Sequence, residues 1–367
     1  MKSILFIGGL GCGGAENQMA VISSLLSQTY NVHFIYMGAD EFCAPILHIS
    51  QVKLNKLVIP KIYVFLRLSR LYILFKVLSF AQKERIDTII SFLDIWNFTA
   101  CAISAITRKR IKAIIGIRNA RQEIYTSLVG KFNNLLNRYA DSIVSNSLNG
   151  IEVYKKYLQH SDVNFVTIYN IIKPLLVTSR YSVRHSGKLS ICIPASYREV
   201  KNPYRLIEAV HKLSTQEQSN LQISWYGRIS SADLDVYYKM TKMLDTYNLH
   251  ECFKLYDASE NIADIMNSSD FVALFSTSEG LPNSICEAMS LAKPVIMSKV
   301  SDYNELVENN ITGYICDPYD IADITNVLRK CTSLDAEKII SMGEAAKSKA
   351  EHLFSTPVVI QKWQNLL

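Results

Sequence analysis

Two carboxylates in the second half of the chain stand eight residues apart, Glu279 in a predicted loop and Glu287 on a predicted helix. Asn283 and Ser284 both favour the N-cap position, so the helix is expected to begin near them, with Glu287 about one turn in. The first amides of a helix carry a partial positive charge of about half a unit, which favours a bound diphosphate. Glu287 can accept hydrogen bonds from two ribose hydroxyls, and Glu279 can hold sugar hydroxyls or face a developing positive charge.

The loop between these carboxylates reads Gly280-Leu281-Pro282-Asn283. Glycine lets a ligand approach the backbone closely, and proline stiffens the turn. The alternative interpretation is that Glu279 is solvated and Glu287 only stabilises the start of the helix. The unusual loop between them favours a binding site.

Two cations, Arg198 and Lys201, follow the predicted strand Leu189–Ile193 and precede a predicted helix. A lysine at a helix start is electrostatically unfavourable unless an anion is bound there. Stabilising the charge that builds on a leaving group is usually a large catalytic term, and a leaving diphosphate would fit these cations. The alternative is a pair of solvated surface cations.

A glycine-rich turn near the N-terminus, Gly8–Gly14, joins a strand to a helix. Glycines there let backbone amides approach a phosphate at a helix start, and Gly9, Gly11 and Gly14 formally match a dinucleotide-binding pattern. That pattern also needs an acid at the end of the second strand, and Asp40 comes late. A tight turn without a ligand is the alternative.

The elements that must position these residues alternate along the chain as strand and helix. Such alternation, with uniformly apolar strands, predicts α/β architecture with parallel sheets covered on both faces. The predicted strands are Ser3–Ile7, Asn31–Met37, Thr88–Phe92, Ala113–Ile117, Ser142–Ser145, Leu189–Ile193, Leu221–Trp225, Phe253–Tyr256, Phe271–Phe275, Pro294–Met297 and Gly313–Cys316. The predicted helices are Ala15–Gln28, Leu66–Lys83, Pro203–Leu213, Ile262–Asn267 and Asn283–Leu291.

The alternation breaks once, over residues 173–188, and then restarts. We therefore predict two Rossmann-like doubly wound domains facing a cleft, residues 1–172 and 189–350, joined by this linker. Residues 351–367 are predicted to form a helix that packs toward the first domain. A chain of 367 residues accommodates two domains of ordinary size.

Charge is distributed unevenly between the halves. The net charge is +6, yet residues 1–185 carry 22 Lys/Arg against 10 Asp/Glu, whereas residues 186–367 carry 17 against 23. A basic half indicates an anionic partner, and the absence of zinc-ligand or aromatic RNA-binding signatures argues against nucleic acid. Eight cysteines without a CxxC pair fit a reducing cytoplasm, and no apolar run approaches the roughly 20 residues of a membrane span.

Much of the positive charge lies between Lys53 and Arg85, interrupted by the apolar runs Ile62–Leu66 and Leu71–Phe75. Cations beside apolar and aromatic residues are typical of contact with an anionic membrane surface. The alternative is a partly buried helix with solvated cationic ends. Together with the basic first half, this stretch predicts a protein peripheral to the inner face of the plasma membrane.

Three motifs together resemble the family-four retaining glycosyltransferases, or glycosyl transferases group 1, which have the GT-B fold. They are Gly13-Gly14-Ala15-Glu16, Lys201-Asn202-Pro203 and Glu279-Gly280-Leu281-Pro282 followed by Glu287-Ala288-Met289. Asn170 resembles the asparagine that the family carries at its domain junction. The resemblance spans nearly the whole chain, and the two glutamates are its most specific part.

The resemblance implies that Glu287 binds the donor ribose, that Glu279 contacts the transferred sugar and that Lys201 with an arginine neutralises the diphosphate. It implies retention of the anomeric configuration, with no metal and no cofactor beyond the nucleotide-sugar substrate, and the loop suggests a UDP-sugar carrying a hexose or N-acetylhexosamine. The donor-binding residues expected are Gly13, Gly14, Arg198, Lys201, Gly280, Leu281, Pro282, Asn283 and Glu287.

Two departures from the family pattern concern the cations and the first domain. The family's arginine lies five residues before the lysine, where this chain has Ser196, so Arg198 is predicted to substitute for it. The family's histidine in the first domain is not evident. Asp94, Arg118 and Asn119 follow strands of that domain and are the candidates for binding an acceptor, expected to be a lipid-linked saccharide.

The sequence therefore predicts a cytoplasmic hexosyltransferase for lipopolysaccharide or other surface polysaccharide. Three alternatives remain open: a two-domain NAD-dependent dehydrogenase, a nucleotide-sugar epimerase on the same fold, and a non-enzymatic nucleotide-sugar-binding scaffold. The dehydrogenase alternative gives Glu279 and Glu287 no role.

Overall fold

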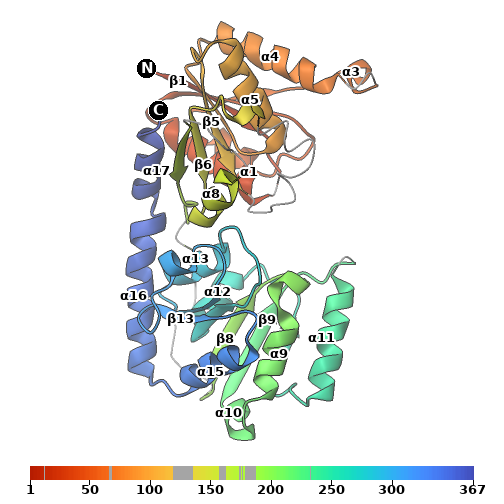
Figure 1. Cartoon of the computed structure of the whole chain (residues 1–367), viewed down its shortest axis with the longest axis vertical. Helices are drawn as coiled ribbons and strands as arrows, with labels where there is room; N and C mark the ends of the chain where they lie inside the picture. The colour runs from red at the N-terminus through yellow and green to blue at the C-terminus, as the bar shows by residue number, and fades with distance from the viewer. Residues whose placement is uncertain are drawn as a thin grey trace. The chain divides into compact units, whose positions relative to one another are not determined.

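The computed structural model describes residues 1–11, 13–65, 68–118, 135–156, 163–172, 175, 177, 187–231 and 233–367 (Figure 1). The chain divides into two compact units. The first consists of Met1–Ile171 with Thr356–Leu367, and the second of Ile172–Ser355. Most of the predicted linker, residues 173–188, lies outside the described residues.

The first unit contains a seven-stranded parallel sheet in the order β3-β2-β1-β4-β5-β6-β7. Its strands are β1 Ser3–Gly8, β2 Asn31–Tyr36, β3 Lys53–Lys56, β4 Thr88–Ser91, β5 Lys112–Ile117, β6 Ser142–Ser145 and β7 Asn164–Thr167. The central strands β1 and β4 are buried throughout, which is why they read as uninterrupted apolar runs.

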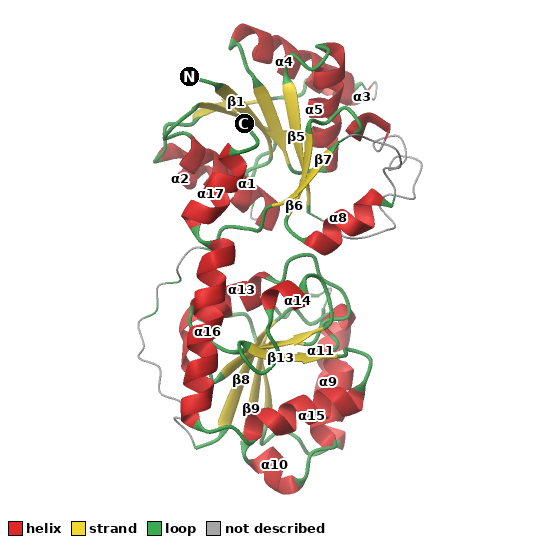
Figure 2. Cartoon of the chain, turned by 60° about the vertical axis from the view of Figure 1, so that its left-hand side comes forward, coloured by secondary structure: helices red, strands yellow, loops and turns green. Residues whose placement is uncertain are grey.

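Helices cover both faces of this sheet (Figure 2). They are α1 Gly14–Leu26, α2 Ala44–His48, α3 Lys61–Phe65, α4 Ser69–Lys83, α5 Asp94–Ile106, α8 Leu148–Lys155 and α17 Thr356–Gln364. One core packs α1, α2 and α17 on the sheet around Phe34 and Trp363, and the other packs α4 and α5 around Ile73 and Trp96. The return of the C-terminal helix to the first unit, predicted from the sequence, is thereby confirmed.

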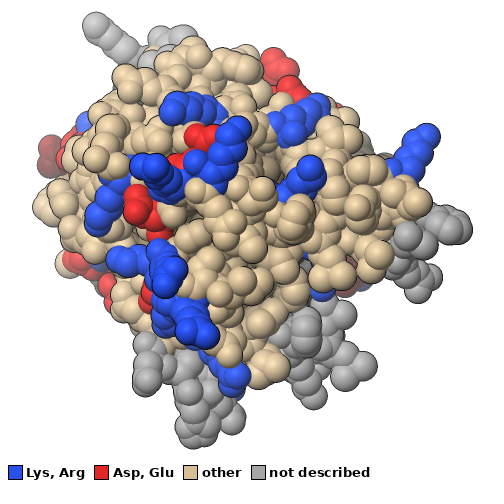
Figure 3. Space-filling view, turned by 90° about the horizontal axis from the view of Figure 1, so that it is seen from above, with Lys and Arg blue, Asp and Glu red and all other residues tan. Residues whose placement is uncertain are grey.

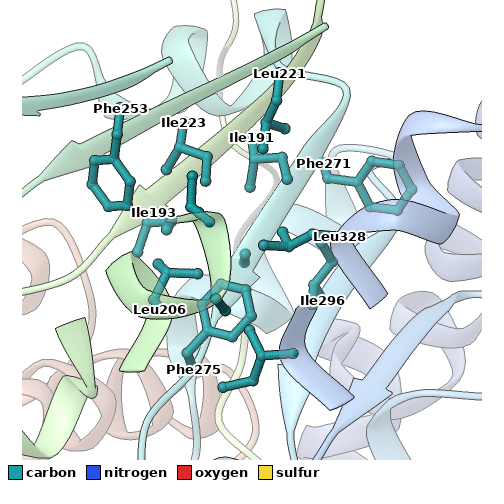
Figure 4. Packing of buried hydrophobic residues seen from close by; sticks show 14 of the residues in the cluster. Ile191, Ile193, Leu206, Leu221, Ile223, Phe253, Phe271, Phe275, Ile296 and Leu328 are labelled. Carbon is teal, nitrogen blue, oxygen red and sulfur yellow. The ribbon is translucent and has the colours of Figure 1, made fainter. Parts of the chain in front are cut away.

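The second unit contains a six-stranded parallel sheet in the order β10-β9-β8-β11-β12-β13. Its strands are β8 Leu189–Pro194, β9 Leu221–Tyr226, β10 Phe253–Tyr256, β11 Phe271–Leu274, β12 Val295–Ser298 and β13 Gly313–Cys316. Its helices are α9 Pro203–His211, α10 Thr215–Ser219, α11 Leu234–Thr246, α12 Ile262–Ser268, α13 Asn283–Ser290, α14 Tyr303–Leu306, α15 Ile321–Thr332 and α16 Ala336–Phe354. Figure 4 shows Ile191, Ile223 and Phe253 from adjacent strands packing into one core.

The α/β class with two parallel doubly wound sheets is confirmed. The sequence missed β3 and β7, the two edge strands of the first sheet, because neither is fully buried and β3 reads Lys-Leu-Asn-Lys. The single helix predicted over Leu66–Lys83 is also wrong in its bounds: α4 begins at Ser69, after the separate short helix α3. Residues 66 and 67 lie outside the described residues.

Each sheet reverses its strand order once. The reversal falls between β1 and β4 in the first unit and between β8 and β11 in the second. Ligands of open α/β sheets bind outside the carboxyl ends of the strands at such reversals. A ligand-binding site is therefore expected at each of these two edges.

Candidate active site

The loops after β8 and β11 lie side by side at the strand reversal of the second unit. The two strands are neighbours in register, with Phe271 opposite Ile191, so their following segments leave the sheet together. The amide of Thr277 donates to the carbonyl of Val200 at 2.8 Å, which ties one loop to the other. Sequence segments nearly eighty residues apart thus form one surface.

An ion pair occupies the centre of this surface. Lys201 Nζ lies 2.6 Å from Glu279 Oε1, and the same oxygen accepts a hydrogen bond from Ser276 Oγ at 2.6 Å. The side chains of Lys201 and Glu279 are only 21% and 14% exposed. A pair so shielded from water interacts much more strongly than a surface pair, so both groups are held in place.

Backbone geometry fixes the position of Lys201. It ends a 3-10 turn, Glu199–Lys201, and is followed by Asn202, whose φ of 62° lies in the left-handed region. The buried Asn202 side chain donates to the carbonyl of Pro318 at 2.7 Å, and its Oδ1 accepts from Arg205 at 3.1 Å. An asparagine tolerates this conformation better than most residues, and Pro203 then starts α9.

The loop Gly280–Asn283 is anchored from the neighbouring strand. Ser298 Oγ donates to the carbonyl of Ser276 at 2.6 Å, Ser301 Oγ donates to the carbonyl of Gly280, and Leu281 is buried. The predicted start of α13 near Asn283 is confirmed, but neither Asn283 nor Ser284 is its N-cap residue. Pro282 occupies the N-cap position, makes no side-chain cap bond, and Asn283 is the first helical residue.

Glu287 lies on α13, one turn after its start, among the buried residues Ile285, Cys286 and Ala288. Within the described part of the chain its carboxylate makes no hydrogen bond or ion pair. Burial raises the pKa of Glu287 because loss of water disfavours the charged form. Hydroxyl donors from a ligand would compensate that cost, as the predicted ribose would.

Arg198 makes a different kind of contact. Its Nε lies 3.4 Å from Asp233 Oδ1, and Asp233 also accepts from Ser230 Oγ at 2.8 Å. The Arg198 side chain is 62% exposed. An ion pair this exposed contributes about 0–1 kcal/mol, so Arg198 can leave Asp233 at little cost and turn toward an anion.

The glycine turn of the first unit differs from the sequence interpretation in one respect. Gly13 precedes α1 and Gly14 is its first residue, but the Glu16 side chain folds back over the turn. A Cβ at Gly13 would lie 2.1 Å from Glu16 Oε2, and one at Gly9 would lie 3.7 Å from Oε1. A side chain at Gly13 would displace the Glu16 carboxylate from this position, and the carboxylate in turn opposes a phosphate at the same place.

The remaining acceptor candidates are only partly described. The Asp94 side chain and the whole of Asn119 lie outside the described residues. Arg118 is described: its Nη1 donates to Asn170 Oδ1 at 3.1 Å, and its guanidinium lies 3.8 Å from the centre of the Phe92 ring. The structure therefore brings Arg118 together with Asn170, the residue matched to the family's domain junction.

Two residues of the second-unit site were missed from the sequence, Ser276 and Asp233, which hold Glu279 and Arg198. Asn202 was recognised as part of a motif, but its left-handed turn was not predicted. A hydroxyl directly after an apolar strand is the only sequence signal for Ser276, and nothing in the sequence pairs Asp233 with Arg198.

Among the residues described, no three His, Cys, Asp or Glu side chains cluster as metal ligands would.

Known proteins resemble this chain in sequence and in fold. Residues 179–349 match the family model for glycosyl transferases group 1. The N-acetyl-alpha-D-glucosaminyl L-malate synthase of Bacillus anthracis is 24% identical, over 98% of this chain and 93% of the relative. The UDP-Gal:alpha-D-GlcNAc-diphosphoundecaprenol alpha-1,3-galactosyltransferase of Escherichia coli is 29% identical over 32% of this chain and 30% of the relative.

Solved structures share the fold over the full length. Anabaena Alr3699/HepE, solved in complex with UDP, superposes with a TM-score of 0.81 at 19% identity, covering 100% of this chain and 99% of its own. The apo form of the lipopolysaccharide outer core galactosyltransferase WaaB gives a TM-score of 0.79 at 16% identity, covering 99% and 98%. The resemblance to GT-B proteins inferred from three short motifs is confirmed.

Proposed function

We propose that this chain, a group 1 glycosyltransferase with the GT-B fold, transfers a sugar from a UDP-sugar to a lipid-linked or saccharide acceptor during surface polysaccharide assembly. The observation that carries the proposal is the shielded Lys201–Glu279 pair at the strand reversal of the second unit. The similarity to Alr3699/HepE, which binds UDP, and to transferases named for amylovoran, colanic acid and capsule biosynthesis supports it.

The second unit would bind and activate the donor. Breaking the bond between the anomeric carbon and the diphosphate leaves negative charge on the departing oxygen. Lys201 and the first amides of α13 can stabilise that charge, and Arg198 can add a further cation once it leaves Asp233. These groups supply positive charge from the protein itself, so we propose a reaction that requires neither metal nor other cofactor.

The two glutamates would then have separate tasks. Glu287, shielded and short of donors, would accept the ribose hydroxyls of the nucleotide. Glu279, held by Lys201 and Ser276, would contact the transferred sugar, proposed to be a hexose or N-acetylhexosamine. Retention of the anomeric configuration is proposed from the motif resemblance.

The first unit would bind the acceptor. The Bacillus anthracis relative is named for action on L-malate, and the Escherichia coli galactosyltransferase for action on a diphosphoundecaprenol-linked sugar. Both acceptors carry an anionic group. The basic character of the first half fits such an acceptor. Asp94, Arg118 and Asn119 remain the predicted acceptor-binding residues.

A surface of the first unit, here named the α3–α4 surface, has the composition expected for contact with anionic lipid. Its exposed apolar residues include Leu71 and Phe75, which are 61% and 68% exposed and lie one turn apart on α4. The cations on its two helices are Lys61, Arg70 and Lys76, and its other exposed apolar residues are Val58, Ile62, Val64 and Leu68. Figure 3 shows Lys and Arg outnumbering Asp and Glu on the visible face of the molecule.

Contacts within this surface pair charge with aromatic rings. Arg70 lies 5.6 Å from the centre of the Phe98 ring and Lys76 lies 5.6 Å from that of Tyr72. Apolar groups that enter the interface beside cations that meet phosphate headgroups bind anionic membranes. No helix among the described residues is long and apolar enough to cross a membrane. We propose a cytoplasmic protein attached peripherally through the α3–α4 surface.

Transfer is tested with a panel of UDP-sugars and a GlcNAc-diphospho-lipid acceptor, with products identified by mass spectrometry and the anomeric linkage by NMR. We expect one donor to give a product extended by one sugar of retained configuration. Release of UDP without an extended acceptor, or an isomerised donor sugar, would contradict the proposal.

Calorimetry that compares the binding of UDP with the binding of NAD separates a transferase from a dehydrogenase. We expect UDP to bind and NAD not to bind.

Membrane contact is tested by co-sedimentation with vesicles of phosphatidylglycerol and phosphatidylethanolamine. We expect Phe75→Glu to reduce the bound fraction severalfold at low salt, because it places a charge in the inserting face. Ile340→Glu alters a similarly exposed apolar residue in the second unit and serves as the matched control. Equal binding of both variants would place the membrane contact elsewhere.

A further inference from the structure

A cation lies beside the strand reversal of the first unit, one strand further along the sheet than the loops that hold the ion pair in the second unit. Arg118 directly follows β5, whose neighbour β4 is followed by Phe92. Both residues therefore leave the sheet at its carboxyl edge, next to the reversal between β1 and β4.

The guanidinium of Arg118 is oriented from two sides. It stacks on Phe92, whose ring lies 5.7 Å from that of Trp363 on α17. Gly116 permits this stack, because a Cβ there would lie 2.4 Å from the Phe92 ring. On the other side Nη1 donates to the buried Asn170 at 3.1 Å.

A second clamp holds the segment that carries Asn170. Gln18 of α1 donates to the carbonyl of Ile171 at 2.9 Å and accepts from the amide of the same residue at 2.9 Å. The residue after Asn170 is thus fixed to the helix that follows the glycine turn. The Arg118 guanidinium is consequently held by a rigid frame of two strands and a helix.

Two nitrogens of this guanidinium, Nε and Nη2, are buried and make no hydrogen bond to any residue that the structure describes. Nor does Arg118 form an ion pair with a described carboxylate. Burial lowers the pKa of Arg118 to about 9, so it is still charged at neutral pH. Nε and Nη2 form one edge of the guanidinium, and that edge is the fork that binds two oxygens of a carboxylate or phosphate.

We propose that the Nε–Nη2 edge of Arg118 binds an oxyanion of the acceptor, either the diphosphate of a lipid-linked sugar or a carboxylate. This inference rests on the proposed function and adds the chemical class that the first unit recognises. Asn170 and Phe92 position the guanidinium, and the bound anion supplies the acceptors that its two remaining nitrogens require. A buried guanidinium with two nitrogens that lack acceptors among the described residues is costly, which favours a charged ligand at this edge.

Calorimetry on the full chain saturated with UDP tests the site directly, because UDP fills the donor site beforehand. Inorganic pyrophosphate and malonate are the probes, one for a diphosphate and one for a carboxylate. We expect wild type to bind at least one probe and Arg118→Gln to bind it roughly tenfold or more weakly, as loss of charged hydrogen bonds predicts. Arg118→Lys keeps the charge but not the fork and should fall between them.

Lys112→Gln is the matched control, since Lys112 is an exposed cation at the opposite end of the same strand. It should bind both probes as wild type does. Three results would each overturn the acceptor site. They are equal probe binding by wild type and Arg118→Gln, no binding of either probe to the UDP complex, and weakened UDP binding in Arg118→Gln. The last result would assign Arg118 to the donor diphosphate.

Arg118→Leu separates binding from a structural role. Arg118 has no ion pair among the described residues and two of its nitrogens lack acceptors there, so replacing it by an apolar group should leave the melting temperature unchanged or raise it. A clear fall would show that Arg118 completes the fold, and would overturn the proposal. If wild type transfers sugar and Arg118→Gln has an unaltered KM for the acceptor, the anion site is refuted but the transferase function is supported. If wild type uses no donor sugar but probe binding depends on Arg118, the transferase function is refuted but the anion site is supported.

Discussion

The two strand reversals present opposite electrostatic situations. In the second unit the cation Lys201 is already bonded to Glu279, which Ser276 also holds. In the first unit Arg118 is held by an aromatic ring and a neutral amide, with two nitrogens unpaired among the described residues. The cation of the second unit is thus neutralised without a ligand, whereas the cation of the first unit has unmet hydrogen-bonding capacity among the described residues.

This difference separates two tasks. A paired cation keeps its position before the donor arrives and can share its charge with a leaving diphosphate, so the geometry does not have to reorganise. An unpaired cation instead gains most when its ligand binds, which makes it selective for a charged group. A cation that is already paired suits catalysis, and a cation with unmet hydrogen-bonding capacity suits ligand recognition.

The largest expected effect comes from removing the central cation. Lys201→Ala should lower kcat about 100- to 1,000-fold, because it deletes a group that stabilises the leaving diphosphate. It should also lower the melting temperature, since Glu279 keeps a shielded charge without its partner. Steady-state kinetics and thermal melting measure the two. Lys212→Ala, at an exposed position after α9, is the control; near-normal kcat in Lys201→Ala would remove this edge from the chemistry.

Glu279→Ala should lower kcat about 10- to 100-fold while changing the Kd for UDP little, because its proposed contact is with the transferred sugar. Product formation and calorimetry distinguish the two quantities. Glu308→Ala, which removes a half-exposed carboxylate paired with Lys349 on α16, provides a comparison. A loss of UDP affinity with unchanged kcat would exchange the roles assigned to the two glutamates.

Glu287→Ala should weaken UDP binding about tenfold and affect kcat less, since it removes the proposed acceptor for ribose hydroxyls. Burial raises the pKa of Glu287, so its carboxylate takes up a proton at a higher pH than an exposed glutamate does. UDP affinity is therefore expected to fall as pH decreases through that raised pKa, and Glu287→Gln to remove this dependence. Calorimetry at several pH values tests it, and an unchanged profile would contradict the role.

The same pKa has a consequence for stability, with the opposite sign from that of a paired carboxylate. Because the folded state holds the proton more tightly than the unfolded state, the ligand-free protein loses stability as pH rises from the unfolded to the folded pKa of Glu287. Glu287→Gln should flatten that part of the pH profile of the melting temperature. A profile identical to wild type would mean that the carboxylate is compensated.

Arg198→Ala carries the smallest expected effect, a fall in kcat of several-fold with an unchanged melting temperature. Its ion pair with Asp233 is exposed, and such pairs contribute about 0–1 kcal/mol to stability. Arg329→Ala removes a comparably exposed arginine paired with Glu217 and is the matched control. If Arg198→Ala matches Lys201→Ala in kcat, Arg198 fully replaces the arginine that the family carries at the position of Ser196.

The sequence determined the parts of this protein that depend on local pattern. Apolar runs as short as Ser142–Ser145 locate buried parallel strands, because burial on both faces disfavours charged and large polar side chains. The two glutamates, Lys201 and the glycine turn were likewise visible as residue types at fixed spacings after strands. The edge strand β3 was not, since a half-exposed strand carries charged residues that read as a loop.

Tertiary structure alone decided which charges are paired. Nothing local indicates that Lys201 meets Glu279 across seventy-eight positions of sequence, that Asp233 takes Arg198, or that Arg118 has a ring and an amide as its neighbours. Strand order brings those side chains together, and burial then sets the strength of each charge interaction. Both depend on distances between segments remote in the chain, which residue types and spacing do not encode.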